Sequence, residues 1–262
     1  MLIPECSPKT PFPQLVVTCR GRILEAEADL AVSAIGHVLA RYTGVAAAHL
    51  RLTEAMREDG STLLQVNLRV GDIPARIQIS GPNGESVVSD AAERLDRTLL
   101  RLTATQCVPR PWPDLTRPAL AQVRDGVVCR RKVYGLPRLA EPSLAVSLMD
   151  AMDYDVYLFT DAPTGEDAIV YRAGPIGLRL ARQHRMHPPD LSAHLPVTIN
   201  PHATPSLYEK QAVHRLCHHG LPFLFFTDSD TGRGHLLYRR YDGDLTLIIP
   251  LESADHETAA SK

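Results

Sequence analysis

Histidines are the first side chains of this chain that could bind a ligand. His214, His218 and His219 are spaced i, i+4 and i+5 along one predicted helix, with Cys217 beside them. Imidazole and thiolate are zinc ligands, but no carboxylate or cysteine set completes a recognisable site around these three residues. We therefore interpret them as solvated histidines on a helix, and the sequence predicts no metal site.

Asp161 and Asp228 suggest a catalytic interpretation, because each follows Phe-Thr and precedes a Thr-Gly pair. Each, however, lies at the turn position where an Asp side chain caps its own backbone. The chain also has no nucleophile elbow, no P-loop and no Gly-x-Gly-x-x-Gly fingerprint. The sequence therefore predicts a protein that is not an enzyme and that uses no cofactor and no small-molecule substrate.

Arginine offers the remaining chemistry, which is contact with phosphate. The net charge is -2, so no global basic field attracts nucleic acid. Residues 103–140 nevertheless hold 7 Lys and Arg against 2 Asp and Glu, whereas residues 1–102 hold 11 against 12. Arg94, Arg97 and Arg101, the arginine stripe, recur at i, i+3 and i+7 on a predicted helix and could each meet an RNA phosphate. A solvated helix face is the alternative interpretation.

The elements that carry the stripe form a predicted α+β domain in the order β-α-β-β-β-α. Three runs alternate apolar and polar residues, so their sheet has one packed face and one polar face. Both helices must cover the packed face, because each has an apolar side at spacings of three and four. The predicted strands are 15–19, 48–53, 63–70 and 75–80, and the predicted helices are 25–42 and 86–102.

A duplicated stretch organises the rest of the chain. Phe159-Thr-Asp-Ala-Pro-Thr-Gly165 returns 67 residues later as Phe226-Thr-Asp-Ser-Asp-Thr-Gly232, and 11 of 36 positions in residues 145–180 are identical in residues 212–247. Each copy is typical of a hairpin whose glycine supplies a positive φ. Each repeat is predicted to be a small β-α-β-β-β module. The first has strands at 127–134 and 176–181, a helix at 143–152 and the hairpin at 155–172; the second has strands at 196–200 and 244–250, a helix at 206–218 and the hairpin at 222–239.

The predicted organisation follows from these elements. It is a tail (1–13), an N-terminal domain (14–103), a linker rich in Pro and Arg (104–126), repeat one (127–181), a second linker (182–194), repeat two (195–251) and a tail (252–262). Five dispersed cysteines favour a reducing cytosol. No signal peptide or membrane span is predicted, so we expect a cytoplasmic protein.

Several motifs resemble those of ribosome hibernation promoting factors, the family that includes ribosome-associated inhibitor Y. In the N-terminal domain they are Cys19-Arg-Gly-Arg22, Ala40-Arg-Tyr42, Leu64-Gln-Val-Asn-Leu68, Pro74-Ala-Arg76, Gly81-Pro82 and the helix that carries the arginine stripe. Both repeats resemble the C-terminal module of the family, with its Thr-Gly hairpin and its Tyr-Arg pair. A chain with two such modules resembles the dormancy- or hypoxia-associated translation inhibitors of mycobacteria.

The resemblance implies binding to the small ribosomal subunit, with its 16S rRNA and proteins, in the path of mRNA and tRNA. Translation inhibition and protection of idle ribosomes under stress, dormancy or hypoxia would follow. The N-terminal domain is not basic, whereas the N-terminal domains of family members usually are. This difference gives more weight to the linker arginines as RNA contacts. The expected RNA contacts are Arg20, Arg22, Arg41, Arg69, Arg76, Arg94, Arg97, Arg101, Arg110 and Arg117. The alternative is a dormancy regulator that acts on a protein partner through its paired modules.

In the family, the single C-terminal module associates with a second copy and so pairs two ribosomes. Here a second module is tethered by a short linker, which raises its effective concentration. We therefore expect the modules to pair within a monomer, which silences single ribosomes. The expected interface residues, which could instead lie beneath the helix of their own module, are Tyr157, Phe159, Tyr171, Leu224, Phe226 and Tyr238.

Overall fold

The computed structural model describes most of the chain. The described residues are Phe12 and residues 14–54, 62–103, 129–134, 140–173, 177–186, 197–240 and 244–250. The predicted linker 104–126, the C-terminal tail and most of the N-terminal tail lie outside them, as does much of the second linker. The chain divides into two compact units, which are described separately.

The first unit contains the N-terminal domain, a four-stranded sheet with two helices. Its elements are β1 (Val16–Arg20), α1 (Glu25–Ala40), β2 (Val45–Glu54), β3 (Thr62–Val70), β4 (Ile73–Gly81) and α2 (Gly84–Thr103). The strand order is β1-β2-β3-β4, with β1 parallel to β2 and the other pairs antiparallel. The predicted order β-α-β-β-β-α is therefore confirmed.

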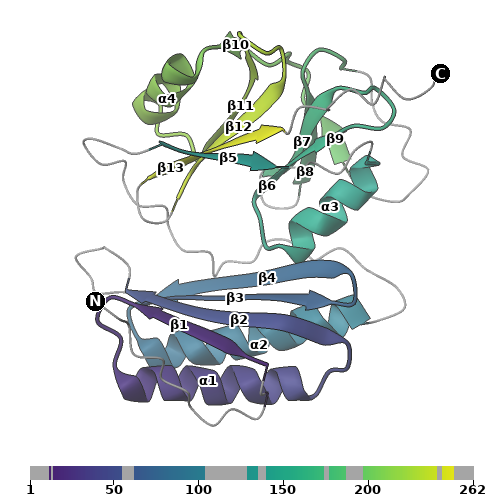
Figure 1. Ribbon diagram of the computed structural model, residues 1–262. Coiled ribbons are helices and arrows are strands. Elements are labelled where there is room, and N and C mark those ends of the chain that lie inside the picture. Colours follow the sequence, from purple (N-terminus) through teal and green to yellow (C-terminus); the bar gives the residue numbers. More distant parts are fainter. Residues whose placement is uncertain are drawn as a thin grey trace, which may run out of the picture. The chain divides into compact units, whose positions relative to one another are not determined.

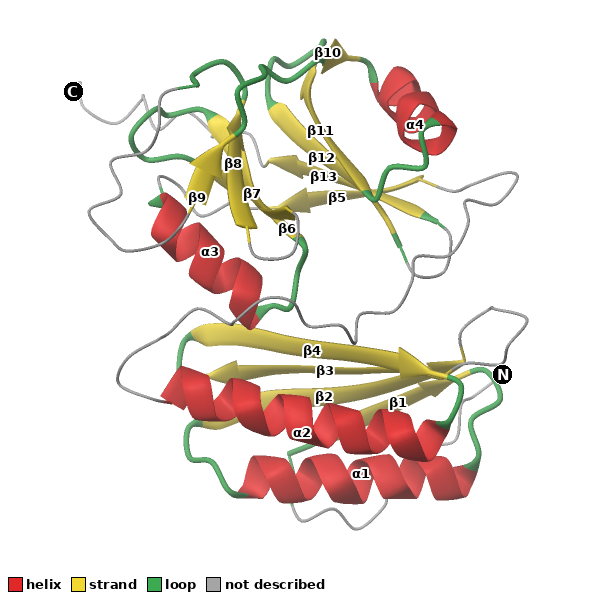
Figure 2. Ribbon diagram, turned by 180° about the vertical axis from the view of Figure 1, so that it is seen from behind, coloured by secondary structure: helices red, strands yellow, loops and turns green. Residues whose placement is uncertain are grey.

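Both helices cover one face of this sheet (Figure 2). Alternate residues of β2 to β4 point into the core between sheet and helices, where Leu50, Val66 and Ile77 are fully or almost fully buried. Leu95 and Leu99 of α2 complete the core from the helix side. Because the side chains of a strand alternate between faces, the polar residues of the same strands must lie on the uncovered face.

The second unit contains two sheets. One has the order β6-β7-β8-β9, and the other has the order β10-β11-β12-β13-β5. Their strands are β5 (Cys129–Tyr134), β6 (Val156–Thr160), β7 (Asp167–Ala173), β8 (Gly177–Arg182), β9 (Val197–Ile199), β10 (Ser206–Leu207), β11 (Phe223–Asp228), β12 (Gly234–Arg239) and β13 (Leu245–Pro250). The helices of the repeats are α3 (Pro142–Ala151) and α4 (Glu209–His218).

The two repeats exchange their first strands. β5, the first strand of repeat one, lies parallel to β13, the last strand of repeat two (Figure 1). Conversely, β9, the first strand of repeat two, lies parallel to β8, the last strand of repeat one. The sequence predicts all strands of a repeat in one module, and the observed exchange differs because a sequence pattern shows that a strand forms but not which edge it joins.

Each repeat has the predicted hairpin, β6–β7 in the first and β11–β12 in the second. The turns need a left-handed residue, which Gly165 and Gly232 supply with φ of 72° and 67°. The aspartate of each turn accepts a hydrogen bond from the nearby threonine hydroxyl, at 2.7 Å for Asp161 and 2.9 Å for Asp228. These contacts give both aspartates a structural role in the turn.

Candidate nucleic-acid interface

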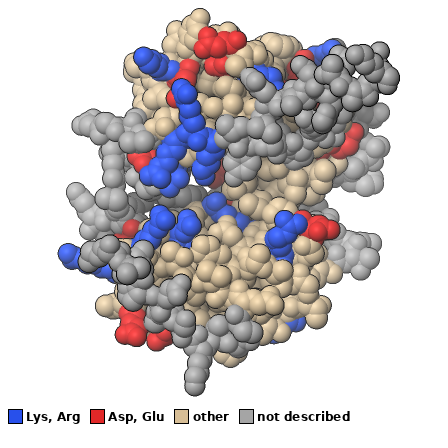
Figure 3. Space-filling view, viewed as in Figure 1, with Lys and Arg blue, Asp and Glu red and all other residues tan. Residues whose placement is uncertain are grey.

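The face of the N-terminal sheet opposite α1 and α2 is polar and hydrogen-bonded, and residues 146–155 cover part of it, so that Gln78 is 3% exposed. Thr18 Oγ1 lies 2.8 Å from His49 Nε2 on neighbouring strands. Gln78 Oε1 accepts hydrogen bonds from both Gln65 Nε2 and Arg76 Nη2. Figure 3 shows Lys and Arg side chains on the side of this domain that carries the sheet. The face can therefore present cations to a polyanion.

Five of the predicted arginines of this domain are exposed. Arg20 and Arg22 have no ion pair with any described residue. The other three form surface pairs: Arg41 lies 2.8 Å from Asp96, Arg69 lies 3.7 Å from Asp72, and Arg97 lies 3.8 Å from Glu93. Exposed pairs of this kind contribute at most about 1 kcal/mol. An incoming phosphate can therefore replace the carboxylate at little cost.

The arginine stripe is divided, because its other two members are paired with aspartates of repeat one. Residues 146–155 form one compact unit with the N-terminal domain. Arg94 Nη2 donates to Asp153 Oδ1 at 2.7 Å, and the two side chains are 3% and 4% exposed. Arg101 lies 3.0 Å from Asp150. Of the three stripe arginines, Arg97 is exposed, Arg94 is buried and Arg101 is partly buried.

The same segment also contacts the sheet. The backbone N–H of Gln78 donates to Asp153 Oδ2 at 3.2 Å, so this carboxylate joins α2 to β4. The guanidinium carbon of Arg76 lies 5.2 Å from the centre of the Tyr154 ring, a cation–π distance. Arg76 is thus held against an aromatic ring and a glutamine, and Asp153 is the centre of this contact.

Asp150, Asp153 and Tyr154 are not among the residues predicted from the sequence. One signal was present: Asp150 lies in the last turn of α3, where the helix dipole favours a cation and the helix has no basic residue. An acidic residue at that end indicates a cationic partner elsewhere. Asp153 has a φ of 53°, a left-handed conformation that only the structure reveals.

A second group of contacts joins the two repeats through apolar side chains. Leu158, Ile169 and Ala181 of repeat one and Phe225 and Leu236 of repeat two form one buried cluster, the shared cluster. Val156, Tyr171, Phe223 and Ile248 pack around it. Tyr171 and Phe223 meet edge to face, with ring centres 5.5 Å apart.

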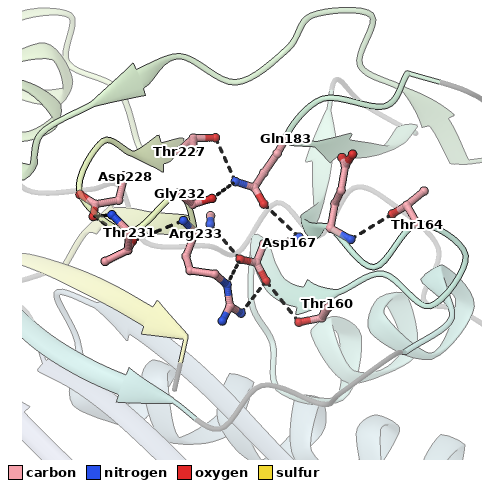
Figure 4. A network of polar contacts seen from close by, with 11 residues as sticks. Thr160, Thr164, Asp167, Gln183, Thr227, Asp228, Thr231, Gly232 and Arg233 are labelled. Atoms are coloured by element: carbon pink, nitrogen blue, oxygen red, sulfur yellow. Dashed lines mark hydrogen bonds and ion pairs between the residues drawn. The ribbon is translucent and has the colours of Figure 1, made fainter. Parts of the chain in front are cut away.

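Polar contacts join the repeats beside the shared cluster (Figure 4). Arg233 of repeat two makes two hydrogen bonds to Asp167 of repeat one, at 2.7 and 3.0 Å. Gln183 Nε2 donates to Thr227 Oγ1 and to the carbonyl oxygen of Gly232, at 3.1 and 3.0 Å. These contacts join repeat two to Asp167 of repeat one and to Gln183, the second residue of the second linker.

The predicted interface residues are divided between the two faces of their strands. Tyr171 packs against the shared cluster, and strand alternation puts Tyr238 on that face with Leu236. Leu224 and Phe226 instead lie in the core beneath α4, with Ala212 and Leu216. Alternation from Leu158 puts the other two expected residues on the face away from the shared cluster: Tyr157 and Phe159.

The histidines of α4, which the sequence predicts to be solvated, and the linker arginines remain to be placed. The rings of His214 and His218 stack with centres 5.8 Å apart, and the described residues include no group of side chains that could hold a metal ion. Arg110 and Arg117 lie outside the described residues. Within the same described part, no helix is long and apolar enough to cross a membrane.

His235 is a buried histidine that the sequence did not distinguish from the others. Its side chain is 5% exposed, and neither ring nitrogen has a hydrogen-bond partner among the described residues. Burial lowers the pKa of His235 below its ordinary value of 6.5, despite Asp228 at 4.0 Å. The folded chain therefore keeps this imidazole neutral.

Lowering the pH should destabilise repeat two through His235. Below pH 6.5 the unfolded state takes up the proton first, so stability falls as the pH falls, by at most about 1.4 kcal/mol per pH unit. Urea midpoints at pH 7.5 and 5.5 would measure the loss, and His235→Leu should reduce it. His214→Leu, on the exposed face of α4, is the control. An equal pH dependence in both variants would contradict the prediction.

Comparison with known proteins places this geometry in a family. Residues 124–180 match the family model described as "Sigma 54 modulation/S30EA ribosomal protein C terminus". The chain is 50% identical over 254 residues to the "Dormancy associated translation inhibitor" of Mycobacterium tuberculosis, in strains H37Rv and CDC 1551, across 94% of this chain and 92% of the relative. The N-terminal domain, the duplicated module and this identity over almost the whole length agree, and the chain belongs to the ribosome hibernation promoting factor family.

Proposed function

We propose that this protein is a ribosome hibernation factor that inhibits translation without catalysis. It binds the small ribosomal subunit in the mRNA and tRNA channel and protects idle ribosomes under stress or dormancy. The observation that carries this proposal is the 50% identity, over 94% of the chain, to a protein named as a translation inhibitor. The five exposed arginines of the N-terminal domain support it, because phosphate contacts supply most of the affinity for a nucleic-acid backbone.

The RNA contacts that we propose first are Arg20, Arg22, Arg41, Arg69 and Arg97, because they are exposed. Arg76, Arg94 and Arg101 can contribute only if residues 146–155 leave the N-terminal domain. Arg110 and Arg117 of the linker remain proposed contacts on the basis of the local charge excess.

We further propose that the protein is a monomer in which the two modules pair with each other. The exchanged strands β5 and β9 and the shared cluster support this proposal, because they use the module surface within one chain. The protein then silences single ribosomes and does not join two of them.

A second candidate function has a specific observation in its favour. Arg94 and Arg101 are paired with Asp153 and Asp150, and residues 1–102 have no basic excess, with 11 Lys and Arg against 12 Asp and Glu. A dormancy regulator that binds a protein partner through its paired modules would need no exposed arginine stripe. Binding to ribosomes that does not change with salt would favour this candidate.

Sucrose-gradient sedimentation with purified ribosomes tests the proposal. The wild-type chain should move with the small subunit and with single ribosomes, without forming ribosome pairs, and its affinity should fall as salt rises. The variant Arg20→Ala/Arg22→Ala/Arg69→Ala should reduce the slope of log affinity against log salt by about 2, since each lost phosphate contact removes about 0.7–0.9.

The matched control removes the same charge from exposed positions of the repeats: Arg179→Ala/Arg185→Ala/Arg215→Ala. This control should keep the wild-type slope. Equal salt slopes for the two triple variants would contradict the proposed RNA contacts of Arg20, Arg22 and Arg69. Abundant ribosome pairs would contradict pairing of the modules within the chain.

A further inference from the structure

The apolar contact between the repeats is nearly symmetric. Four residues of repeat one in or beside the shared cluster have their counterparts, 67 residues later, in the same cluster: Val156 and Phe223, Leu158 and Phe225, Ile169 and Leu236, Ala181 and Ile248. The strand exchange is reciprocal in the same way, since Leu178 pairs with Val197 and its counterpart Leu245 pairs with Cys129. The same patch of each repeat therefore meets the other, as in a two-fold dimer.

One pair of counterparts meets at the centre of this arrangement, and there the repeats differ. Asp167 and Gly234 are also 67 residues apart, and Gly234 N–H donates to Asp167 Oδ2 at 2.8 Å. A Cβ atom on Gly234 would lie 2.6 Å from the Asp167 Cβ atom and 2.9 Å from the ring of Phe225, which belongs to the same repeat as Gly234. Gly234 is not among the positive-φ residues, so the need for glycine here comes from space. Only one of the two positions can carry a side chain.

The charges around this position are asymmetric as well. Asp167, whose side chain is 2% exposed, binds Arg233. The counterpart of Arg233 in repeat one is Glu166, an acid. The counterpart of Gln183, which donates to Thr227 and Gly232, is Pro250, which has no polar side chain.

Pairing of two identical repeats would therefore fail. Two copies of repeat one would bring two Asp167 side chains into the space of one and put Glu166 where Arg233 now lies. Two copies of repeat two would bring two glycines together and leave Arg233 without its carboxylate. Burying Asp167, whose side chain is 2% exposed, without its arginine is costly, and two copies of repeat two would lose both hydrogen bonds between Arg233 and Asp167, so each like pair is disfavoured.

We propose that Asp167 and Arg233-Gly234 form a pairing code, which allows repeat one to bind only the surface of repeat two. The partner that this surface fits is a module with glycine at the central position and arginine before it, whether from the same chain or from a second copy. This inference rests on the proposed pairing of the modules and adds its specificity. A module with a side chain at the central position is excluded.

Three full-length variants test the code. The first, Arg233→Glu/Gly234→Asp, gives both repeats the Glu-Asp sequence. The second, Glu166→Arg/Asp167→Gly, gives both repeats Arg-Gly. The third combines all four substitutions and so exchanges the code between the repeats. Ser229→Asp, which adds a carboxylate to the same hairpin at an exposed position, is the control.

Light scattering and thermal denaturation provide the measurements. The first variant should lose the wild-type melting transition of the repeats or aggregate, while Ser229→Asp behaves as wild type. The third variant should be a monomer that recovers most of the lost melting temperature. If residue 234 had to be glycine for a reason unrelated to Asp167, the substitutions in repeat one would not restore the melting temperature.

The decisive experiment expresses the first and second variants together. Every contact between them joins Glu-Asp to Arg-Gly, so a 1:1 complex of the two chains should form even where each alone is insoluble. Two results would overturn the code. One is a first variant that is as stable as the wild-type chain. The other is a third variant as unstable as the first, combined with the absence of a 1:1 complex of the first and second variants. A dimeric wild-type chain would instead contradict pairing within the chain. The same variants would still test the pairing code, because the code also applies to repeats of two different chains.

Discussion

Replacing Asp153 with Asn should lower the stability of the N-terminal unit by about 3–5 kcal/mol, because it leaves the buried guanidinium of Arg94 without this carboxylate. Asn keeps the size of the side chain and tolerates the left-handed φ of 53°, so the loss reports the charge. The hydrogen bond from the Gln78 N–H to residue 153 would also be weakened. Hydrogen exchange at β4 and α2 measures this unit separately from the repeats.

A double-mutant cycle separates the ion pair from other effects of the substitution. Arg94→Met alone leaves Asp153 buried, whereas Arg94→Met/Asp153→Asn removes both charges and should cost less than the sum of the single changes. Arg97→Ala, which removes an exposed pair with Glu93, is the control and should cost under about 1 kcal/mol. A loss for Asp153→Asn no larger than for Arg97→Ala would contradict the prediction.

The sequence predicted the helix of the arginine stripe but not the aspartates that pair with it. The spacing of Arg94, Arg97 and Arg101 correctly indicated that they lie on neighbouring parts of one helix surface. It could not indicate that residues 146–155 cover two of them, because that contact joins segments more than fifty residues apart. Periodicity identifies a face of a helix but not the neighbour of that face.

The repeats illustrate the same limit on strands. Both hairpins and both helices follow from the sequence, since turn residues and apolar runs are local properties. The phase of the run from Phe223 to Phe226 could not be read, because four consecutive apolar residues offer no alternation. Phe225 faces the shared cluster and Phe226 faces α4, whereas the sequence favoured Phe226 as an interface residue. Strand exchange was equally hidden, since β5 can in principle complete either sheet.

Ending the chain after Pro188 should make repeat one insoluble or unfolded. The truncated chain lacks β13, the strand that pairs with β5, and lacks Phe225 and Leu236, which cover the shared cluster. Leu158 and Ile169, now 3% and 2% exposed, would each lose up to about 1.5–3 kcal/mol of burial. Two such losses, together with an unpaired strand, approach the whole stability of a small module. The N-terminal domain has its own core and should remain folded, but it would lose the ion pairs of Arg94 and Arg101 with Asp153 and Asp150 if repeat one unfolds.

Light scattering and binding of a dye for exposed apolar surface would follow the change. The control is a chain ending after Leu251, which keeps all of the described strands and lacks only the predicted tail. It should stay monomeric. An ordered dimer of the truncated chain is the informative exception. It would bring two copies of Asp167 together and so contradict the pairing code, although the cluster itself would still need a partner. Aggregation without an ordered dimer is the result expected from an apolar patch whose only fitting partner has been removed.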